Sequence, residues 1–188
     1  MNSKKQTIII IGVLVAVTLG ILLWVNQQLN NIDEDKNKTL QLSPTILNNF
    51  KDNKTVYDYP LQSSKPEWGN HYLVVENGGY DMGINYKTDW NEKLGTESNF
   101  PGKDVKGIIV IGMDMVEKGI YVGKFGQEDK AYQRNYIISY FDIYKKTVVA
   151  RDTLYGEDPP LSKRTVGSVA ADFPSDKEVI NSIKSRLK

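Results

Sequence analysis

Hydrophobic residues fill the N-terminal segment 7–25 without a break. The run TIIIIGVLVAVTLGILLWV contains no charge, follows two lysines and gives way to polar residues. A helix rises about 1.5 Å per residue, so the run reaches roughly 28 Å, close to the hydrocarbon thickness of a bilayer. The pattern predicts one transmembrane helix anchored in lipid by residues that include Ile8, Leu14, Leu22 and the interfacial Trp24.

A cleaved export signal is the alternative interpretation of this segment. Such signals usually have an apolar core of about 7 to 15 residues, followed by a small-x-small cleavage site. Here the small residues Ala16, Thr18 and Gly20 lie inside the run, and further apolar residues follow them. The pattern therefore favours an uncleaved anchor over a secreted soluble domain.

The flanks of the segment predict its orientation. Cytoplasmic flanks of membrane helices carry an excess of Lys and Arg. Lys4 and Lys5 lie on the short N-terminal side, whereas the far side opens with the acidic residues 33–35. We predict a single-pass protein of the cell membrane, with residues 1–6 cytoplasmic and the chain beyond the anchor extracytoplasmic.

Residues 26–42 are mostly polar and predict a solvated stalk, into which the anchor helix extends as far as Ile32. Asp33, Asp35 and Asn37 have the spacing that opens a calcium-binding loop. Lys38 and Pro44 stand where that loop needs glycine and glutamate, so we predict no metal site here.

The pattern changes in residues 43–188. A short apolar helix over 43–51 can begin at Ser43, with proline at its first position. Short β-prone runs separated by Gly, Asn, Asp and Pro then predict strands. Ser175 and Glu178 form a capping box before the amphipathic pattern of a C-terminal helix over 175–187. The predicted strands cover 56–59, 71–76, 107–115, 118–125, 132–142 and 147–154.

Three of these segments define the expected sheet. Residues 132–142 and 147–154 predict a hairpin joined through 143–146. The run 107–115 is apolar on both faces and predicts a central strand. Residues 77–101 predict a long loop with one strand inside. The predicted fold class is α+β: a single transmembrane helix, then one domain with a mainly antiparallel sheet.

Composition excludes several classes of function. Two of the 24 basic residues precede the anchor and all 23 acidic residues follow it, so the exposed part is nearly neutral. That balance argues against a nucleic-acid partner. The absence of cysteine excludes disulfides, cysteine-ligated zinc, iron–sulfur clusters and thiol nucleophiles, and we predict no cofactor. A secreted eukaryotic domain of this size usually has disulfides, so the sequence favours a bacterial cell envelope.

Catalytic chemistry has few candidate residues. His71 is the one histidine, and no Gly-x-Ser-x-Gly turn exposes a serine nucleophile. Gly119, Gly123 and Lys124 do not have the spacing of a phosphate-binding loop. Carboxylates near strand ends or in the long loop remain, but their spacing indicates no pair. These candidates are Glu76, Asp81, Asp89 and Asp114.

A binding function requires fewer specific residues than a catalytic one. Tyr80, Tyr86 and Trp90 in the long loop can form a stacking surface for a sugar or a peptide, although the favoured interpretation is that they cover the sheet. The cations Lys184, Arg186 and Lys188 near the C-terminus complement a helix dipole, with a binding role as the alternative. We predict a non-enzymatic, membrane-anchored binding or assembly module whose partner is an envelope protein or glycan. A membrane-tethered hydrolase of envelope material that uses carboxylates is the alternative.

Overall fold

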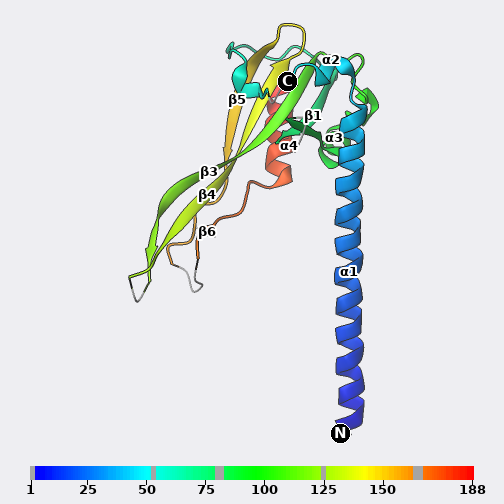
Figure 1. The fold of residues 1–188 in the computed structure, drawn as a ribbon, viewed down its shortest axis with the longest axis vertical. Helices are drawn as coiled ribbons and strands as arrows, with labels where there is room; N and C mark the ends of the chain where they lie inside the picture. Colours follow the sequence, from blue (N-terminus) through cyan, green and yellow to red (C-terminus); the bar gives the residue numbers. More distant parts are fainter. Residues whose placement is uncertain (1–2, 52–53, 79–82, 124–125, 163–166) are drawn as a thin grey trace.

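The computed structural model describes residues 3–51, 54–78, 83–123, 126–162 and 167–188 of the 188. It consists of a long N-terminal helix and one α+β domain at the C-terminal end of that helix (Figure 1). The elements, in chain order, are α1 (Ser3–Gln41), α2 (Pro44–Leu47), η1 (Val56–Asp58), β1 (Tyr72–Asn77), β2 (Ile84–Tyr86), α3 (Thr88–Leu94), η2 (Glu97–Asn99), β3 (Gly107–Val122), β4 (Glu128–Asp142), β5 (Thr147–Tyr155), β6 (Val169–Ala170) and α4 (Asp176–Leu187).

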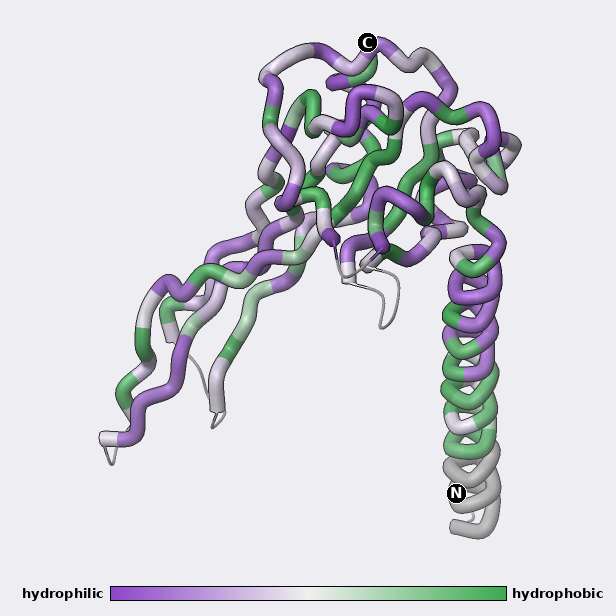
Figure 2. Tube along the Cα trace, turned by 45° about the horizontal axis from the view of Figure 1, so that its top comes forward, coloured by the Kyte–Doolittle hydropathy of each residue, from purple (hydrophilic) through white to green (hydrophobic). Residues whose placement is uncertain are grey.

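Helix α1 extends away from the domain, and residues 13–25 of its apolar part are exposed (Figures 1 and 2). Its described part, Val13–Gln41, is long and apolar enough to cross a membrane, and none of its most apolar window is buried. A signal sequence near the N-terminus would meet the same test. Leu14, Leu22 and Trp24 are exposed, and Ile8 lies in the part of α1 where only the backbone path is described.

The predicted solvated stalk is wrong in one respect, because residues 33–38 belong to α1 and its last turns dock on the domain. Asp35 Oδ1 accepts the backbone N–H of Thr88 at 3.0 Å, at the first residue of α3. Thr39 Oγ1 accepts the backbone N–H of Tyr86 at 2.8 Å. Glu34 and Lys38 form an ion pair at 2.7 Å, four residues apart. A polar composition fits a docked helix as well as a stalk, since the docking partners lie some 50 residues away in sequence.

Replacing Thr39 with valine should destabilise the domain by about 1–3 kcal/mol, because the Tyr86 N–H would be buried without an acceptor. The measurement is urea unfolding of the full chain in detergent micelles, followed by circular dichroism. Thr45→Val is the matched control, since Thr45 is exposed and should change stability little. An equal loss in both variants would contradict the role of the Thr39 hydroxyl.

The sheet has the strand order β2-β1-β3-β4-β5, with β6 pairing with β4. The pairs β1–β2, β3–β4 and β4–β5 are antiparallel, whereas β1–β3 and β4–β6 are parallel. The predicted α+β class is confirmed, and the sheet is mixed. As predicted, β3 lies inside the sheet, and residues 108–111 of its apolar half are fully buried.

Three local predictions are corrected. Residues 107–122 form one strand rather than two, because the expected turn near Glu117 is a β-bulge and the reversal of the chain follows Val122. Residues 56–58 form a 3₁₀ turn, closed by a capping box between Thr55 and Asp58, rather than a strand. The expected loop over 77–101 contains the predicted strand, β2, but also helix α3. The predicted hairpin is present as β4 and β5.

Each face of the sheet has its own hydrophobic core. On one face, Phe141 and Val110 pack with Ile46 and Phe50 from the segment around α2. On the other, Ile109 and Ile138 pack with residues that include Val179 and Ile183 of α4. Helix α4 begins with the predicted capping box, in which the Ser175 hydroxyl accepts the N–H of Glu178. We call these the α2 face and the α4 face.

Candidate functional site

The three aromatic residues predicted to bind do not form an exposed surface at the two positions that the structure describes. Tyr86 is 1% exposed and belongs to the core on the α2 face. Trp90 is 5% exposed on the α4 face, and its indole N–H donates to Asp176 Oδ1 at 3.2 Å. Tyr80 lies outside the described residues. A binding role for this set stays a prediction.

The carboxylates considered for catalysis are separated. Glu76 lies 3.8 Å from the Lys87 ammonium. Asp114 follows Val110 at even spacing on β3 and therefore projects on the α2 face, whereas Glu76 follows Val74 and projects on the α4 face. Asp89 is exposed in the first turn of α3, and Asp81 lies outside the described residues. Among the described residues, no group of three or more His, Asp or Glu could hold a metal ion.

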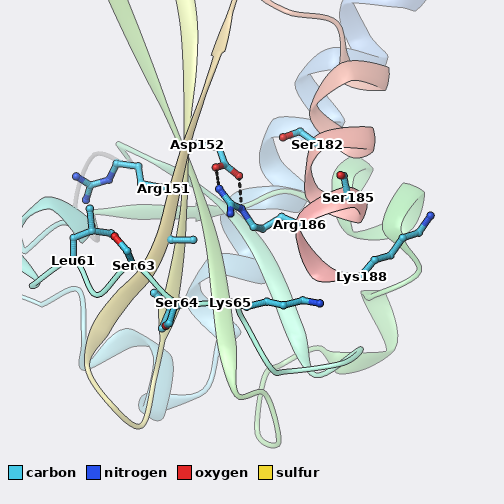
Figure 3. Close-up of a pocket in the computed structure, with 12 residues that line it drawn as sticks. Leu61, Ser63, Ser64, Lys65, Arg151, Asp152, Ser182, Ser185, Arg186 and Lys188 are labelled. Atoms are coloured by element: carbon cyan, nitrogen blue, oxygen red, sulfur yellow. Dashed lines mark hydrogen bonds and ion pairs between the residues drawn. The ribbon is translucent and has the colours of Figure 1, made fainter.

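A groove of about 740 Å³ lies where β5, the segment 61–65 and the C-terminal end of α4 meet (Figure 3). Strand β5 supplies its floor from residues 149–152. Ser182, Ser185 and Arg186 reach it from α4, and Ser63 and Lys65 from the opposite side. Figure 1 places this end of α4 at the end of the domain furthest from the N-terminus of α1. We call this feature the β5 groove.

The floor of the groove is an edge strand that is only half covered. The N–H of Val148 donates to Pro60 O at 2.9 Å, and Val148 O accepts the N–H of Gln62 at 2.8 Å. The last such bond joins the N–H of Ser64 to Val149 O. Beyond Val149, β4 is the one strand paired with β5 among the residues that the structure describes.

The ladder shows which backbone groups of β5 face outward. Past the end of β5, the N–H of Gly156 donates to Arg134 O, so the even residues of β4 turn their backbone groups toward β5. These even residues of β4 lie opposite Asp152 and Leu154 of β5, whose backbone groups therefore point toward β4. In an antiparallel ladder the alternate residues then direct their N–H and C=O away from the partner. Arg151, Thr153 and Tyr155 therefore direct their backbone N–H and C=O outward, and none of the strands that the structure describes pairs with this free edge.

Positive charge dominates the lining of the β5 groove. Four cations, Lys65, Arg151, Arg186 and Lys188, line it together with one carboxylate, Asp152. Arg151 turns to the α2 face, where its Nε donates to Ser139 Oγ at 3.1 Å and its guanidinium lies 4.8 Å from the ring centre of Tyr57. Within the described residues, Lys65 and Lys188 form no ion pair and are available to an anionic ligand.

Asp152 and Arg186 fix α4 against β5. The Arg186 Nε donates to Asp152 Oδ2 at 2.9 Å, and a second guanidinium nitrogen donates to Oδ1, which gives a bidentate pair. The hydrogen bond to Asp152 raises the pKa of Arg186. Below the pair, burial raises the pKa of the Tyr140 phenol, and the Asp152 charge adds to that rise. Arg186 therefore holds α4 against β5 in addition to contributing positive charge to the groove.

The sequence does not predict this groove. It shows the cations at the end of α4 as a cluster, but the helix dipole is the favoured explanation for that cluster, and Lys184 of the cluster does not line the groove. Lys65 stands in a segment without periodicity, so nothing in the sequence indicated that it lies across from α4. One signal could have indicated the groove: residues 147–154 are the last predicted strand of the chain, and such a strand could have been predicted to lie at an edge of the sheet.

Comparison with protein-family models, with curated proteins and with solved structures finds no match to this chain. The geometry of the β5 groove and the apolar part of α1 are therefore the features that bear on function.

Proposed function

We propose that this protein is a non-enzymatic binding module of a bacterial cell envelope, held in the cell membrane by an uncleaved α1 with its N-terminus cytoplasmic. The apolar part of α1 supports the anchor, because the uncharged run 7–25 is long enough to cross the hydrocarbon core and its described residues 13–25 are exposed. Docking of residues 35–42 supports a fixed spacer between membrane and domain. The lysines before the span support the orientation.

The ligand that suits the β5 groove best is an extended acidic peptide from an envelope protein. The observation that supports this is the free edge at Arg151, Thr153 and Tyr155, beside two unpaired cations. A peptide strand added to an edge gains main-chain hydrogen bonds, and flanking side chains supply specificity. Carboxylates on alternate residues would reach Lys65 and Lys188. A carboxylate hydrolase has less support, because Glu76 and Asp114 project on opposite faces of the sheet.

Reversing the two unpaired charges should abolish most of the binding. The full chain in lipid nanodiscs is titrated with a fluorescent peptide of alternating Glu and Val. Lys65→Glu combined with Lys188→Glu should weaken this binding by about tenfold or more, because attraction becomes repulsion at close range. Lys51→Glu combined with Lys103→Glu changes the net charge equally at exposed sites away from the groove and should leave affinity within about twofold.

Thr153→Pro separates strand addition from charge attraction. The substitution removes one outward N–H, and proline is tolerated on an edge strand whose N–H faces solvent. Peptide affinity should fall by about fivefold, equivalent to one net hydrogen bond. The affinity for inorganic polyphosphate should not change in the Thr153→Pro variant, because polyphosphate binds through charge and not through strand addition. Peptide binding that is insensitive to both the charge reversal and Thr153→Pro would overturn the proposed site.

A further inference from the structure

The outer halves of β3 and β4 form an arm that leaves the domain, defined as Met113–Val122 with Glu128–Tyr136. Figure 1 shows the arm extending downward from the domain, as α1 does, but diverging from α1 to the left, and β6 lies along the arm. In Figure 2, as in Figure 1, the tip of the arm is level with the apolar part of α1. The arm therefore extends to the depth at which α1 becomes lipid-compatible.

A β-bulge decides which side chains share a face of the arm. Up to Glu117, the odd residues of β3 project on the α4 face, since Ile109 and Ile111 belong to that core. The register shifts between Glu117 and Gly119, with Lys118 as the extra residue. Beyond the shift the parity is reversed, because one added residue turns every later side chain to the other face. Ile120 and Val122 consequently join Met113 and Met115 on the α4 face.

The α2 face of the arm is covered by the chain that follows β5. Tyr121 donates its hydroxyl hydrogen to Pro160 O. Gln133 Nε2 donates to Gly156 O at 3.0 Å and to Asp158 Oδ1 at 3.1 Å. Gln133 is buried as a result. The chain after β5 thus covers part of this face, although Val116 on the same face is 39% exposed.

The α4 face of the arm is open and apolar. Met113, Met115, Ile120 and Val122 are 55%, 51%, 52% and 71% exposed. Their partners on β4 are Tyr136, Arg134, Lys130 and Glu128, and Tyr132 lies across from Glu117. Lys130 pairs with Glu117 at 2.8 Å, which neutralises the acidic side chain between the two apolar pairs. Apolar side chains mixed with Tyr, Lys and Arg are the composition of a membrane interface, where long cations extend to the headgroups.

We propose that the α4 face of the arm rests in the headgroup region of the bilayer that α1 crosses, as a second membrane contact. The inference depends on the proposed anchor. It is supported by the direction and depth of the arm and by its open apolar face. Lipid, rather than a second copy of the chain, suits the mixed basic and aromatic surface.

Single cysteines provide a direct test, because the natural chain has none. Val122→Cys and Met115→Cys variants of the full chain carry an environment-sensitive fluorophore in vesicles of phosphatidylcholine and phosphatidylglycerol. A quencher attached to the lipid headgroup should lower the fluorescence of these labels by about twofold or more. Val116→Cys, on the opposite face of the arm, and Tyr144→Cys, in the turn between β4 and β5, should show little quenching.

A label at Leu14→Cys, quenched from within the acyl region, reports on the anchor separately. Quenching at Leu14 without quenching at Val122 would overturn the arm contact and leave the anchor intact. No quenching at Leu14 would overturn the anchor itself. A Val122 label that the lipid quencher does not affect, and whose shielding from water increases with protein concentration, would show a contact between copies of the chain. That result would also overturn the inference.

Discussion

The double substitution Val13→Lys with Val17→Lys should release the protein from membranes washed with alkaline carbonate. Both side chains are exposed on α1 near the middle of the predicted span, so the domain should fold unchanged. Each lysine at the centre of a membrane helix costs about 2.5–3.5 kcal/mol on insertion scales. The two together disfavour insertion by about 6 kcal/mol, or about four powers of ten in equilibrium. The measurement is the fraction of the chain that pellets with vesicles after the wash.

Lysines at Leu29 and Ile32 are the matched control for the anchor. These side chains are equally exposed on the same helix, but beyond the apolar run. The double variant Leu29→Lys with Ile32→Lys should remain in the pellet. An unmodified protein that the wash already extracts, or whose intact mass lacks the first part of α1, would contradict the anchor and favour a cleaved export signal.

Replacing Gly107 with alanine should destabilise the domain by about 3 kcal/mol, because the site has no room for a methyl group. A Cβ atom at Gly107 would lie 2.2–2.3 Å from three ring atoms of Trp68. The indole cannot move aside easily, since it is 4% exposed and its N–H donates to Asp142 Oδ2. The free energy of unfolding in urea, for the full chain in micelles, measures the loss.

Gly119→Ala is the control within the same strand. No atom lies within 4 Å of a Cβ built at Gly119, so alanine there should leave stability within about 0.5 kcal/mol. The clash also predicts coupling: in a Trp68→Ala background, Gly107→Ala should cost little. A full loss in that background would show that the backbone at Gly107, rather than the indole, sets the requirement for glycine.

Local patterns predicted the elements whose determinants lie close together in sequence. The capping box at Ser175 and the apolar spacing after it are contained in one short segment, and α4 forms there. The β4–β5 hairpin is likewise specified by two adjacent strands and the turn between them. The fold class followed from these elements.

The errors arose where a distant partner decides the structure. A bulge at Lys118 resembles a turn in sequence, and only the pairing of Glu117 with Tyr132 and Gly119 with Ala131 shows that the strand continues. The docking of Asp35 and Thr39 depends on backbone groups of β2 and α3. The β5 groove joins three segments that no spacing links, so its cations were recognised on one side only.

In the proposed arrangement, the continuity of α1 would link the thickness of the bilayer to the position of the proposed binding site. Residues 26–41 raise the domain by about 24 Å, with no joint between span and domain. A span that is too long for its bilayer tilts, commonly by about 20°. That tilt would carry the top of α1 sideways by about 8 Å and turn the β5 groove with it. Regions of membrane that differ in thickness would thus present the same site to its partner at different angles.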